Sequence, residues 1–519
     1  MRFCDFGEFL PTGDLWTRLC RNYARLEEET YYPENVFKRE GVNTKWPGDA
    51  EGRTLLAWVL LGQATGRAPR YLAGTLARWP HEVNEAGYFG RQYSDGISEQ
   101  QLSGHGWVLQ ALAELERWLP EGPAWQRAQP IIDNLFLPTA DAYAQYSIDP
   151  SQREAAGEYS GSHLKQLGPW ILSTDVGCFA VGMAGLIDAC EAFGQQTRLK
   201  TLIEAMLGRF LAIDLVTIQA QTHATLTGCR ALLRWARLTR QADLVDEVAK
   251  RFELFTATAW SETYANFNWF DRPKWTEPCA VVDALMVAME LWRLTSTTTY
   301  LQQAQVIWFN ALGHGQRANG GFGCDNCPGA DGSTELAFSV PEAHWCCTMR
   351  GAEGLARMTQ YCAAREGDSL FLPFGLPGDY MAGESRLSVH TSYPRNATWH
   401  LANGGSEALP VALFLPPWIA GIPERGDDGW LRLTVPAGEV VEINGHLTEG
   451  ERPLLPPTTR FAEQHGVSAV TGQPLAVRYR GPLLLADYGG GDWRPIADDF
   501  LRHDLRKETS AKTLLTPLA

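Results

Sequence analysis

Two short motifs in this chain carry residues that could bind a metal ion and also do chemistry. Cys346 and Cys347 are adjacent, and Glu277 and Cys279 stand two positions apart earlier in the chain. Adjacent cysteines cannot form a disulfide with each other without severe strain, but two thiolates can bind one soft metal ion. With the carboxylate and the third thiol they would form a site of three sulfurs and one oxygen, for which zinc is the best candidate. A thiolate that zinc keeps ionised is also a potential nucleophile.

A second set of cysteines offers a different metal site. Cys324 and Cys327 have the C-x₂-C spacing of structural zinc sites and could join Cys346 and Cys347 in a zinc knuckle. The second arm of such a knuckle normally also has C-x₂-C spacing, which adjacent cysteines lack. All of these residues could instead be buried free thiols. Spacing alone leaves the three interpretations open.

Length and composition indicate a folded protein of at least two domains. The chain has 519 residues, of which 45% are hydrophobic and 20% charged. Its net charge of −15 argues against a nucleic-acid partner, because no basic stripe offsets it. We see no secretory signal and no membrane span, and eleven scattered cysteines fit a reducing compartment. We therefore expect a cytoplasmic protein without a membrane partner; a homodimer stays open.

The first two thirds of the chain, from about residue 12 to 366, have the apolar periodicity of helices joined by short Gly-, Pro- and Asp-rich segments. In the segment 279–294, Val281, Leu285 and Trp292 follow one helical face, and the other faces carry little charge. The predicted helices span residues 51–66, 100–119, 125–146, 175–194, 198–211, 223–238, 242–258, 279–294, 299–312 and 350–365. We expect an α/α toroid whose active site lies in a funnel lined by the loops 261–278 and 313–345.

After about residue 368 the periodicity changes to that of strands. Leu387, Val389 and Thr391 alternate with polar neighbours, as do residues in 431–435 and 475–480, and Pro and Gly recur between these runs. This pattern is typical of a β-sandwich. We expect a helical domain at 1–367, a β-sandwich at 368–500 and a tail or extension at 501–519.

The metal motifs resemble glycoside hydrolase family 127 and its relative, family 146. The likeness rests on residues 275–280, on the Tyr-containing stretch 300–310 that ends in Asn310, and on the Cys346-Cys347 pair. It extends to Glu51-Gly-Arg, Gly104-His105 and 474–482, and so spans most of the chain. Only the Glu-x-Cys element with the Cys-Cys pair is highly specific. The families are known chiefly as β-L-arabinofuranosidases built on an (α/α)₆ barrel with β-sandwich domains.

The resemblance implies Zn²⁺ held by Glu277, Cys279, Cys346 and Cys347, with Cys346 as the nucleophile. Its sulfur would attack the anomeric carbon and form a glycosyl thioether, which water resolves with net retention. Metal coordination would keep the thiol ionised at neutral pH. Four protein ligands usually make a closed, structural site, so Cys346 must bind the zinc and still face the sugar.

A retaining mechanism also needs a carboxyl group as acid and base. In the family this is a Glu some 16 residues before the Glu-x-Cys element. Glu262 lies 15 residues before Glu277 and has an aromatic residue, Tyr264, two positions later; the Gly that precedes the family's Glu is absent. The rival candidate is Glu342, near the cysteine pair.

The chain departs from the family pattern around the cysteine pair. His344 stands where a third cysteine is common, residues 348–350 replace a Pro-Pro-Asn run, and Ser98 takes the place of a His. The forked donor of Arg350 suits carboxylates or hydroxyl pairs, which would indicate an altered or acidic sugar, or else it forms a salt bridge to a nearby helix. The residues we expect to contact substrate are His105, His223, Tyr264, His344, Trp345 and Arg350. Either lone histidine could instead be a satisfied core residue, and Trp345 could simply pack.

The resemblance therefore implies a retaining exo-glycosidase that releases terminal β-L-arabinofuranose or a related furanosyl sugar. A hydrolase of another pentose-like or carboxylated sugar is the nearest alternative. A non-catalytic carbohydrate-binding protein with structural zinc is an alternative from another class.

Overall fold

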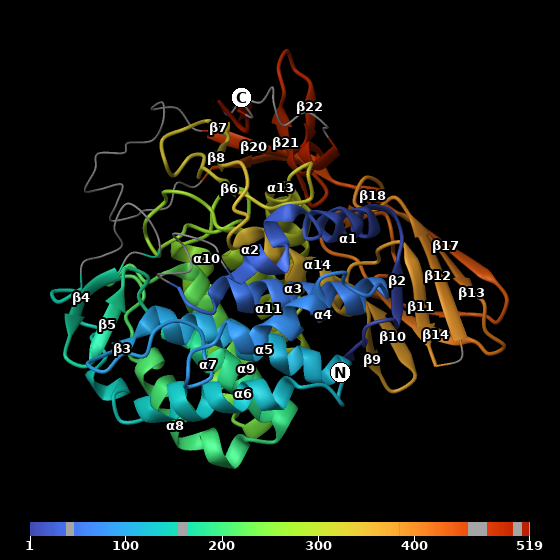
Figure 1. The fold of residues 1–519 in the computed structure, drawn as a ribbon. Coiled ribbons are helices and arrows are strands. Elements are labelled where there is room, and N and C mark those ends of the chain that lie inside the picture. The colour runs from blue at the N-terminus through green and yellow to red at the C-terminus, as the bar shows by residue number, and fades with distance from the viewer. Residues whose placement is uncertain are drawn as a thin grey trace.

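The computed structural model describes residues 1–37, 46–153, 161, 163–383, 385–454, 475–501 and 511–517. They form a mainly helical part with several β-sheets attached to it (Figure 1). In this described part of the chain, no helix is both long and apolar enough to cross a membrane.

Six helices close into a ring at the centre of the helical part (Figure 1). Each packs against the next, and the last packs against the first, in the order α3, α5, α7, α9, α11 and α14. Most residues on every face of these helices are buried, as their low charge predicts. Their bounds are Asp49–Thr65, Glu99–Trp118, Phe179–Phe193, Thr222–Thr239, Pro278–Thr295 and Cys347–Tyr361.

A further helix packs against each member of the ring. These are α4 (Leu72–Arg78), α6 (Ala124–Ile131), α8 (Gln196–Leu211), α10 (Ala242–Thr258), α12 (Thr299–Val306) and, against α14, α1 (Gly13–Arg25). The predicted helix at 242–258 is confirmed. The predicted helix at 125–146 is interrupted after Ile131 by a π-turn and a 3₁₀-turn, because Pro130 and Pro138 remove backbone donors there.

Glycines allow the first ring helices to approach closely. A Cβ atom on Gly106 of α5 would lie 2.2 Å from the carbonyl oxygen of Val181 on α7, and one on Gly185 would lie 2.4 Å from the carbonyl oxygen of Gly106. Side chains at these positions would force the helices apart.

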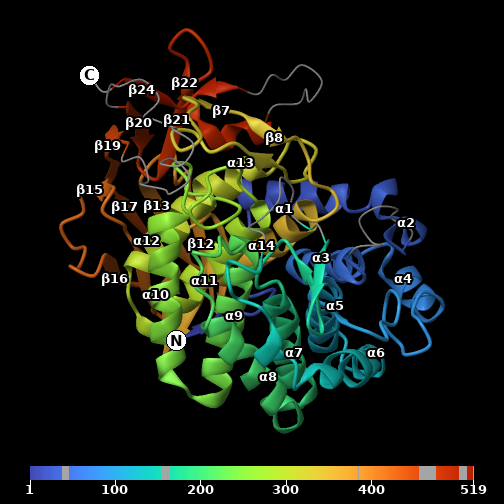
Figure 2. The ribbon, with the colours of Figure 1, turned by 90° about the vertical axis from the view of Figure 1, so that its left-hand side faces the viewer.

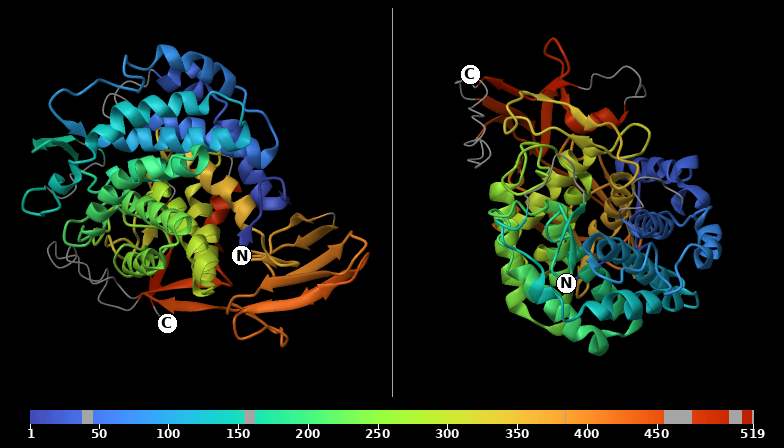
Figure 3. Two further views of the ribbon diagram at one scale, coloured as in Figure 1. Left: turned by 90° about the horizontal axis from the view of Figure 1, so that it is seen from below. Right: turned by 60° about the vertical axis from the view of Figure 1, so that its left-hand side comes forward.

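Two five-stranded sheets lie beside the helical part, and their strands from residue 364 onward are coloured orange in Figure 3 (left). One has the order β1 (Arg2–Phe3), β9 (Ala364–Glu366), β10 (Ser369–Leu372), β14 (Leu409–Phe414) and β16 (Trp430–Val435). The other has the order β17 (Val440–Asn444), β13 (Thr398–Asn403), β12 (Ser385–Thr391), β11 (Gly378–Ala382) and β2 (Phe9–Pro11). Strands from residues 2–11 complete both sheets, so the predicted boundary at residue 367 is not a clean division.

A third sheet covers another side of the ring (Figure 2). Its order is β19 (Glu449–Pro453), β20 (Leu475–Arg480), β21 (Leu483–Asp487), β23 (Lys512–Thr513) and β7 (Glu335–Leu336), with β22 (Trp493–Pro495) on β21 and β24 (Leu515–Pro517) on β20. Asn310 ties it to the helices by donating to the carbonyl oxygen of Pro482 (2.7 Å) and accepting from the Leu484 amide (2.8 Å). Residues 511–517 of the predicted tail therefore return to the body; 502–510 and 518–519 lie outside the described residues.

Candidate active site

A cavity of about 480 Å³ opens at the end of the ring where the ring helices begin. Five of the residues that line it stand at helix N-termini: Asp49 begins α3, and Cys178, Gln221, Glu277 and Cys346 are the N-caps of α7, α9, α11 and α14. Helix N-termini carry a partial positive charge and free N–H groups. The ring therefore favours negative charge, such as thiolates and carboxylates, at this end.

Glu277, Cys279, Cys346 and Cys347 form one cluster in this part of the molecule. Their candidate ligand atoms all lie within 4.8 Å of one another. Cys347 Sγ is 3.7 Å from Cys279 Sγ and 3.5 Å from Cys346 Sγ, too far for disulfide bonds of about 2.05 Å. The two motifs meet because α11 and α14 are neighbours in the ring and carry them on their first turns.

The cluster has the chemistry of a metal site. Three sulfurs and one carboxylate suit a soft or borderline cation. The carboxylate oxygen Oε2 of Glu277 is buried and has no hydrogen-bond partner among the described residues, a costly state that a cation would relieve. Burial raises the pKa of Glu277 to about 7 and the pKa of Cys279 well above its usual value. A bound cation would reverse both shifts and hold the groups ionised.

The three cysteines of the cluster differ in access to the cavity. Cys279 and Cys347 are fully buried, whereas Cys346 is only partly buried. Cys346 and Cys347 line the cavity. Cys346 is thus the sulfur of the cluster most open to a ligand.

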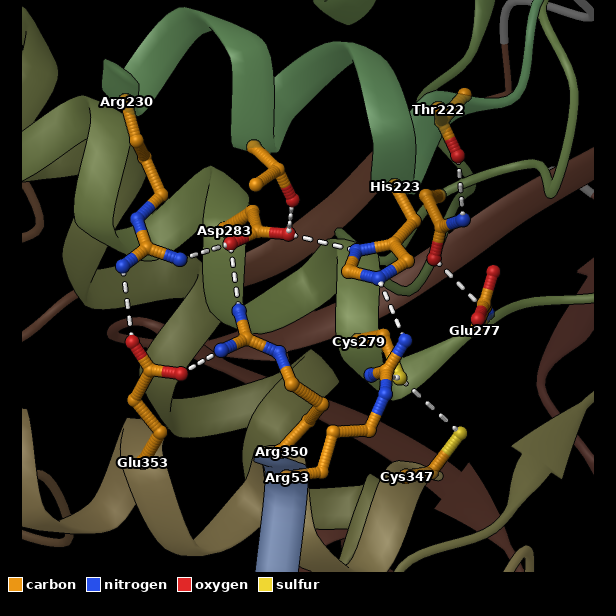
Figure 4. A network of polar contacts seen from close by, with 12 residues as sticks. Arg53, Thr222, His223, Arg230, Glu277, Cys279, Asp283, Cys347, Arg350 and Glu353 are labelled. Carbon is orange, nitrogen blue, oxygen red and sulfur yellow. Dashed lines mark hydrogen bonds and ion pairs between the residues drawn. The ribbon is translucent and has the colours of Figure 1, made fainter. Parts of the chain in front are cut away.

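Arg53 of α3 joins the cluster to neighbouring polar groups (Figure 4). Its Nη1 lies 3.5 Å from Cys279 Sγ, its Nε donates to Asp49 Oδ1 at 2.8 Å, and its Nη2 lies 3.3 Å from His223 Nε2. The guanidinium also lies over the ring of Trp107. Arg53 therefore places a buried positive charge beside the sulfur of Cys279.

Asp283, one turn after Cys279 on α11, gathers a second group of donors (Figure 4). It accepts from His223 Nδ1 at 2.7 Å, Thr227 Oγ1 at 2.8 Å, Arg350 Nη2 at 2.6 Å and Arg230 Nη1 at 2.5 Å. Burial alone would raise the pKa of Asp283, but the charges of Arg350 and Arg230 hold it well below its usual range. The network links α9, α11 and α14 directly beneath the cluster.

Two of the predicted substrate contacts, His223 and Trp345, line the cavity. Because His223 Nδ1 faces the carboxylate of Asp283, its proton lies there and Nε2 is an acceptor.

Arg350 is not placed to contact a sugar. It is 1% exposed, does not line the cavity, and forms salt bridges with Asp283 and Glu353. Of the two roles considered for Arg350, the structure therefore supports the salt bridge to a nearby helix.

The remaining predicted contacts lie elsewhere. His105 is a satisfied core residue: Nε2 accepts from the Phe89 amide at 2.9 Å and Nδ1 donates to the carbonyl oxygen of Gln101 at 2.8 Å. His344 is exposed, with its ring against Trp345. Tyr264 packs against the third sheet.

Neither predicted acid/base residue is among the residues that line the cavity. Glu262 pairs with Arg452 of β19 at 3.1 Å, because its loop turns that side chain toward the third sheet. Glu342 pairs with Arg25 at 2.9 Å and accepts from Asn319 at 2.7 Å.

The cysteines of the alternative knuckle do not form one four-cysteine set. Cys324 lines the cavity and its side chain interacts with that of Cys347, whereas Cys327 is buried and does not line the cavity. In the described part of the chain, the cysteine set that could hold a metal includes Cys279 instead.

Several cavity residues were not predicted from the sequence as site residues. They are Trp46, Asp49, Arg53, Asp175, Asn268 and Trp275. Trp275 and Arg53 belong to the sequence motifs 275–280 and Glu51-Gly-Arg on which the family resemblance rests. Asp49 could have been identified from the sequence by its position at the start of a buried helix, four residues before Arg53.

Comparison with known proteins finds similarity in structure alone. No family model and no curated protein sequence matches the chain. A GH127 β-arabinofuranosidase superposes with a TM-score of 0.66 at 13% identity, covering 94% of this chain and 85% of that one. A GH127 β-L-arabinofuranosidase from Geobacillus stearothermophilus T6 gives 0.64 at 13% identity, covering 93% and 87%. A third structure, described as a glycoside hydrolase, gives 0.63 at 12% identity, covering 93% and 83%. The chain thus has the fold of the GH127 β-L-arabinofuranosidases, and the resemblance inferred from its paired cysteines is confirmed at the level of the fold.

Proposed function

We propose that this chain is a retaining, exo-acting glycoside hydrolase with Cys346 as its nucleophile. The observation that carries the proposal is the Glu277–Cys279–Cys346–Cys347 cluster, whose most accessible sulfur lines a cavity. We also assign the ring helices and the helices outside them to an (α/α)₆ barrel, and the two five-stranded sheets to a β-sandwich.

The choice of Cys346 among the three sulfurs rests on access and charge. Cys279 is fully buried and faces the guanidinium of Arg53, which withdraws electron density from its sulfur. Cys347 is fully buried within α14. Cys346 lines the cavity and is the N-cap of α14, where the helix dipole favours a thiolate.

The four residues of the cluster would hold Zn²⁺. When bound, the ion keeps the cysteines ionised at neutral pH and makes a sulfur a better leaving group. Arg53 and Asp283 would fix the positions of the helix ends that carry these ligands.

The acid/base is best assigned to a carboxyl group at the cavity. Among the described residues, Asp49, Asp175 and Glu277 line it. We assign the role to Asp175, in place of Glu262. Asp175 lines the cavity just before α7, and it is near enough to Glu277 for its charge to raise the pKa of that carboxyl.

The reaction has two displacements. The Cys346 thiolate attacks the anomeric carbon as the bond from that carbon to the aglycone oxygen breaks, and the protonated Asp175 gives its proton to the departing oxygen. Water then attacks the same carbon and gives a proton to the Asp175 carboxylate, while the electron pair of the C–S bond returns to sulfur. Two inversions give net retention.

The cavity fits a small terminal glycosyl group. Its volume of about 480 Å³ lies in the range of small-molecule sites, and Trp46, Trp275 and Trp345 supply aromatic walls. We propose β-L-arabinofuranose or a related furanosyl sugar as substrate, since two of the similar structures are named for that activity. A carboxylated sugar has less support, because Arg350 is buried away from the cavity.

A non-catalytic carbohydrate-binding protein is the second candidate. It is favoured by the four protein ligands, since a closed set is usual for structural zinc.

A panel of 4-nitrophenyl glycosides tests the proposal, with ¹H NMR of the first-formed anomer. We expect hydrolysis of a furanoside with retention and loss of activity in Cys346→Ala. Asp175→Asn should lose most activity on poor leaving groups and much less on 2,4-dinitrophenyl glycosides, which need no proton. Glu262→Gln is the matched control and should stay active. Absence of turnover on every glycoside, or equal activity of Asp175→Asn and the parent, would contradict the proposal.

A further inference from the structure

Asn268 is a fully buried cavity residue whose side-chain amide has no hydrogen-bond partner in the described part of the chain. It is 0% exposed and lies in the loop that leads to α11. Neither Nδ2 nor Oδ1 has a hydrogen-bond partner among the described residues. Buried side-chain amides rarely lack hydrogen-bond partners, because desolvation without a hydrogen bond destabilises the folded protein.

The backbone around Asn268 is, in contrast, firmly bonded. Its N–H donates to the carbonyl oxygen of Trp275 at 2.9 Å, and its own carbonyl oxygen accepts from the Thr222 amide at 3.0 Å. These bonds tie the loop to the start of α9. The fold therefore fixes the position of the residue without using its amide.

Asn266, two residues earlier, shows what a structural amide does in the same loop. Its Nδ2 donates to Thr222 Oγ1 at 2.9 Å and to the carbonyl oxygen of Phe267 at 3.0 Å, and its Oδ1 accepts from the Glu277 amide at 2.9 Å. Both residues are 0% exposed, but only Asn268 lines the cavity.

We propose that Asn268 is a specificity-determining residue whose amide binds two neighbouring hydroxyl groups of the glycone, one through Nδ2 and one through Oδ1. The proposal rests on the proposed function and names the part of the sugar that this loop recognises. An amide suits a vicinal diol because it presents a donor and an acceptor side by side, and each hydroxyl can serve in either role. No hydrogen bond from the described residues holds the side chain, so turning it into the cavity breaks none of the bonds that the structure shows.

Asn268 shares the cavity with Cys346 and Glu277. A diol held at Asn268 orients the sugar ring with respect to the sulfur, and positioning of this kind is a main source of catalytic rate. Discrimination follows from the same geometry, because a sugar that lacks the hydroxyls leaves the buried amide unpaired.

The test combines binding with stability in Asn268→Leu, which keeps the size of the side chain and removes its amide. Calorimetric titration of the purified protein with methyl β-L-arabinofuranoside and its 2-deoxy and 3-deoxy analogues measures recognition. Urea unfolding measures stability. Asn403→Leu is the matched control, because the buried Asn403 donates to the carbonyl oxygens of Glu407 and Val435 at 2.8 and 3.0 Å in the sheets far from the cavity.

We expect Asn268→Leu to bind the parent glycoside about 5- to 150-fold more weakly, which corresponds to about 1–3 kcal/mol. At least one deoxy analogue should bind more weakly than the parent glycoside to the unmodified protein, but equally to Asn268→Leu. Asn268→Leu should unfold at the same or a higher urea concentration, whereas Asn403→Leu should unfold earlier and bind normally.

Three results would overturn the inference: unchanged binding in Asn268→Leu, a loss of stability like that of Asn403→Leu, or no binding of any of the three furanosides to the unmodified protein. Failure of the proposed function looks different. In that case the furanoside binds and depends on Asn268, but no glycoside is hydrolysed.

Discussion

Replacing Arg53 by Met should weaken metal binding by the cluster. The substitution keeps an apolar stem of similar length and removes the guanidinium that lies 3.5 Å from Cys279 Sγ. Opposite unit charges about 4 Å apart attract by about 4 kcal/mol at an effective dielectric constant near 20. The metal shares the negative charge of the Cys279 sulfur, so this value is an upper limit for the attraction between Arg53 and the thiolate. Loss of a group that bonds a metal ligand typically lowers metal affinity about 10- to 100-fold, and we expect a loss in that range.

The same substitution should also destabilise the fold. Arg53 is ion-paired with Asp49 at 2.8 Å, and both side chains are buried. Breaking a buried pair by removing one partner typically costs about 3–5 kcal/mol. Metal affinity must therefore be measured where the variant is still folded.

The assay is competition for Zn²⁺ with a chromophoric chelator, with the folded fraction followed by circular dichroism. Arg357→Met is the matched control. Arg357 also lies on a ring helix and pairs with the buried Glu114, but toward the C-terminal ends of the helices. The Arg357→Met variant should be less stable than the parent protein and should keep its affinity for zinc. Unchanged zinc affinity in Arg53→Met, or an equal loss in Arg357→Met, would refute the role of Arg53.

Three further outcomes are expected. Burial lowers the pKa of His105 to about 4 in the folded protein, whereas an unfolded histidine has a pKa of about 6.5. Between these two pH values the unfolded state binds more protons than the folded state. The free energy of unfolding should therefore fall as the pH drops from about 6.5 to 4. In His105→Gln the fall should be smaller in urea titrations, and an identical pH slope would contradict this. The Cys327→Ser variant should contain as much zinc as the parent protein, as measured by mass spectrometry of metals, since Cys327 lies outside the cluster. A loss of zinc would instead support the knuckle formed with Cys324 and Cys327. Trp345→Ala should raise KM more than it lowers kcat, because the ring forms a wall of the cavity; an unchanged KM would exclude stacking.

The elements that sequence could predict are those set by local pattern. The apolar residues of 279–294 define a buried helix, which the structure extends by one residue at each end. The alternation at 387–391 defines β12. The strands at Arg2–Phe3 and Phe9–Pro11 are too short to carry a periodic signal, and they exist only through pairing with β9 and β11.

The candidate metal cluster could be predicted because its residue types are restrictive. A carboxylate and three cysteines in two short motifs suit one soft ion, and α11 and α14 then meet in the ring. The acid/base that we propose, Asp175, could not be found by counting residues from Glu277. A separation along a loop does not fix the direction of a side chain, and Glu262 points to Arg452, which is distant in sequence.

Arg350 and His105 show a second limit of sequence reasoning. Their side chains are chemically suited to a sugar, but both are used inside the fold, by Asp283 and by the backbone of Phe89 and Gln101. Whether a polar side chain faces a cavity or a buried partner depends on helix rotation within the ring, which one sequence does not determine.

The most direct test of the account is peptide mapping by mass spectrometry after reaction with a mechanism-based furanosyl inactivator, such as an epoxide analogue of β-L-arabinofuranose. The account predicts one added glycone mass, on the peptide that contains Cys346, and none after replacement of Cys346 by Ala. Attachment to Asp49, Asp175 or another residue in place of Cys346 would contradict it.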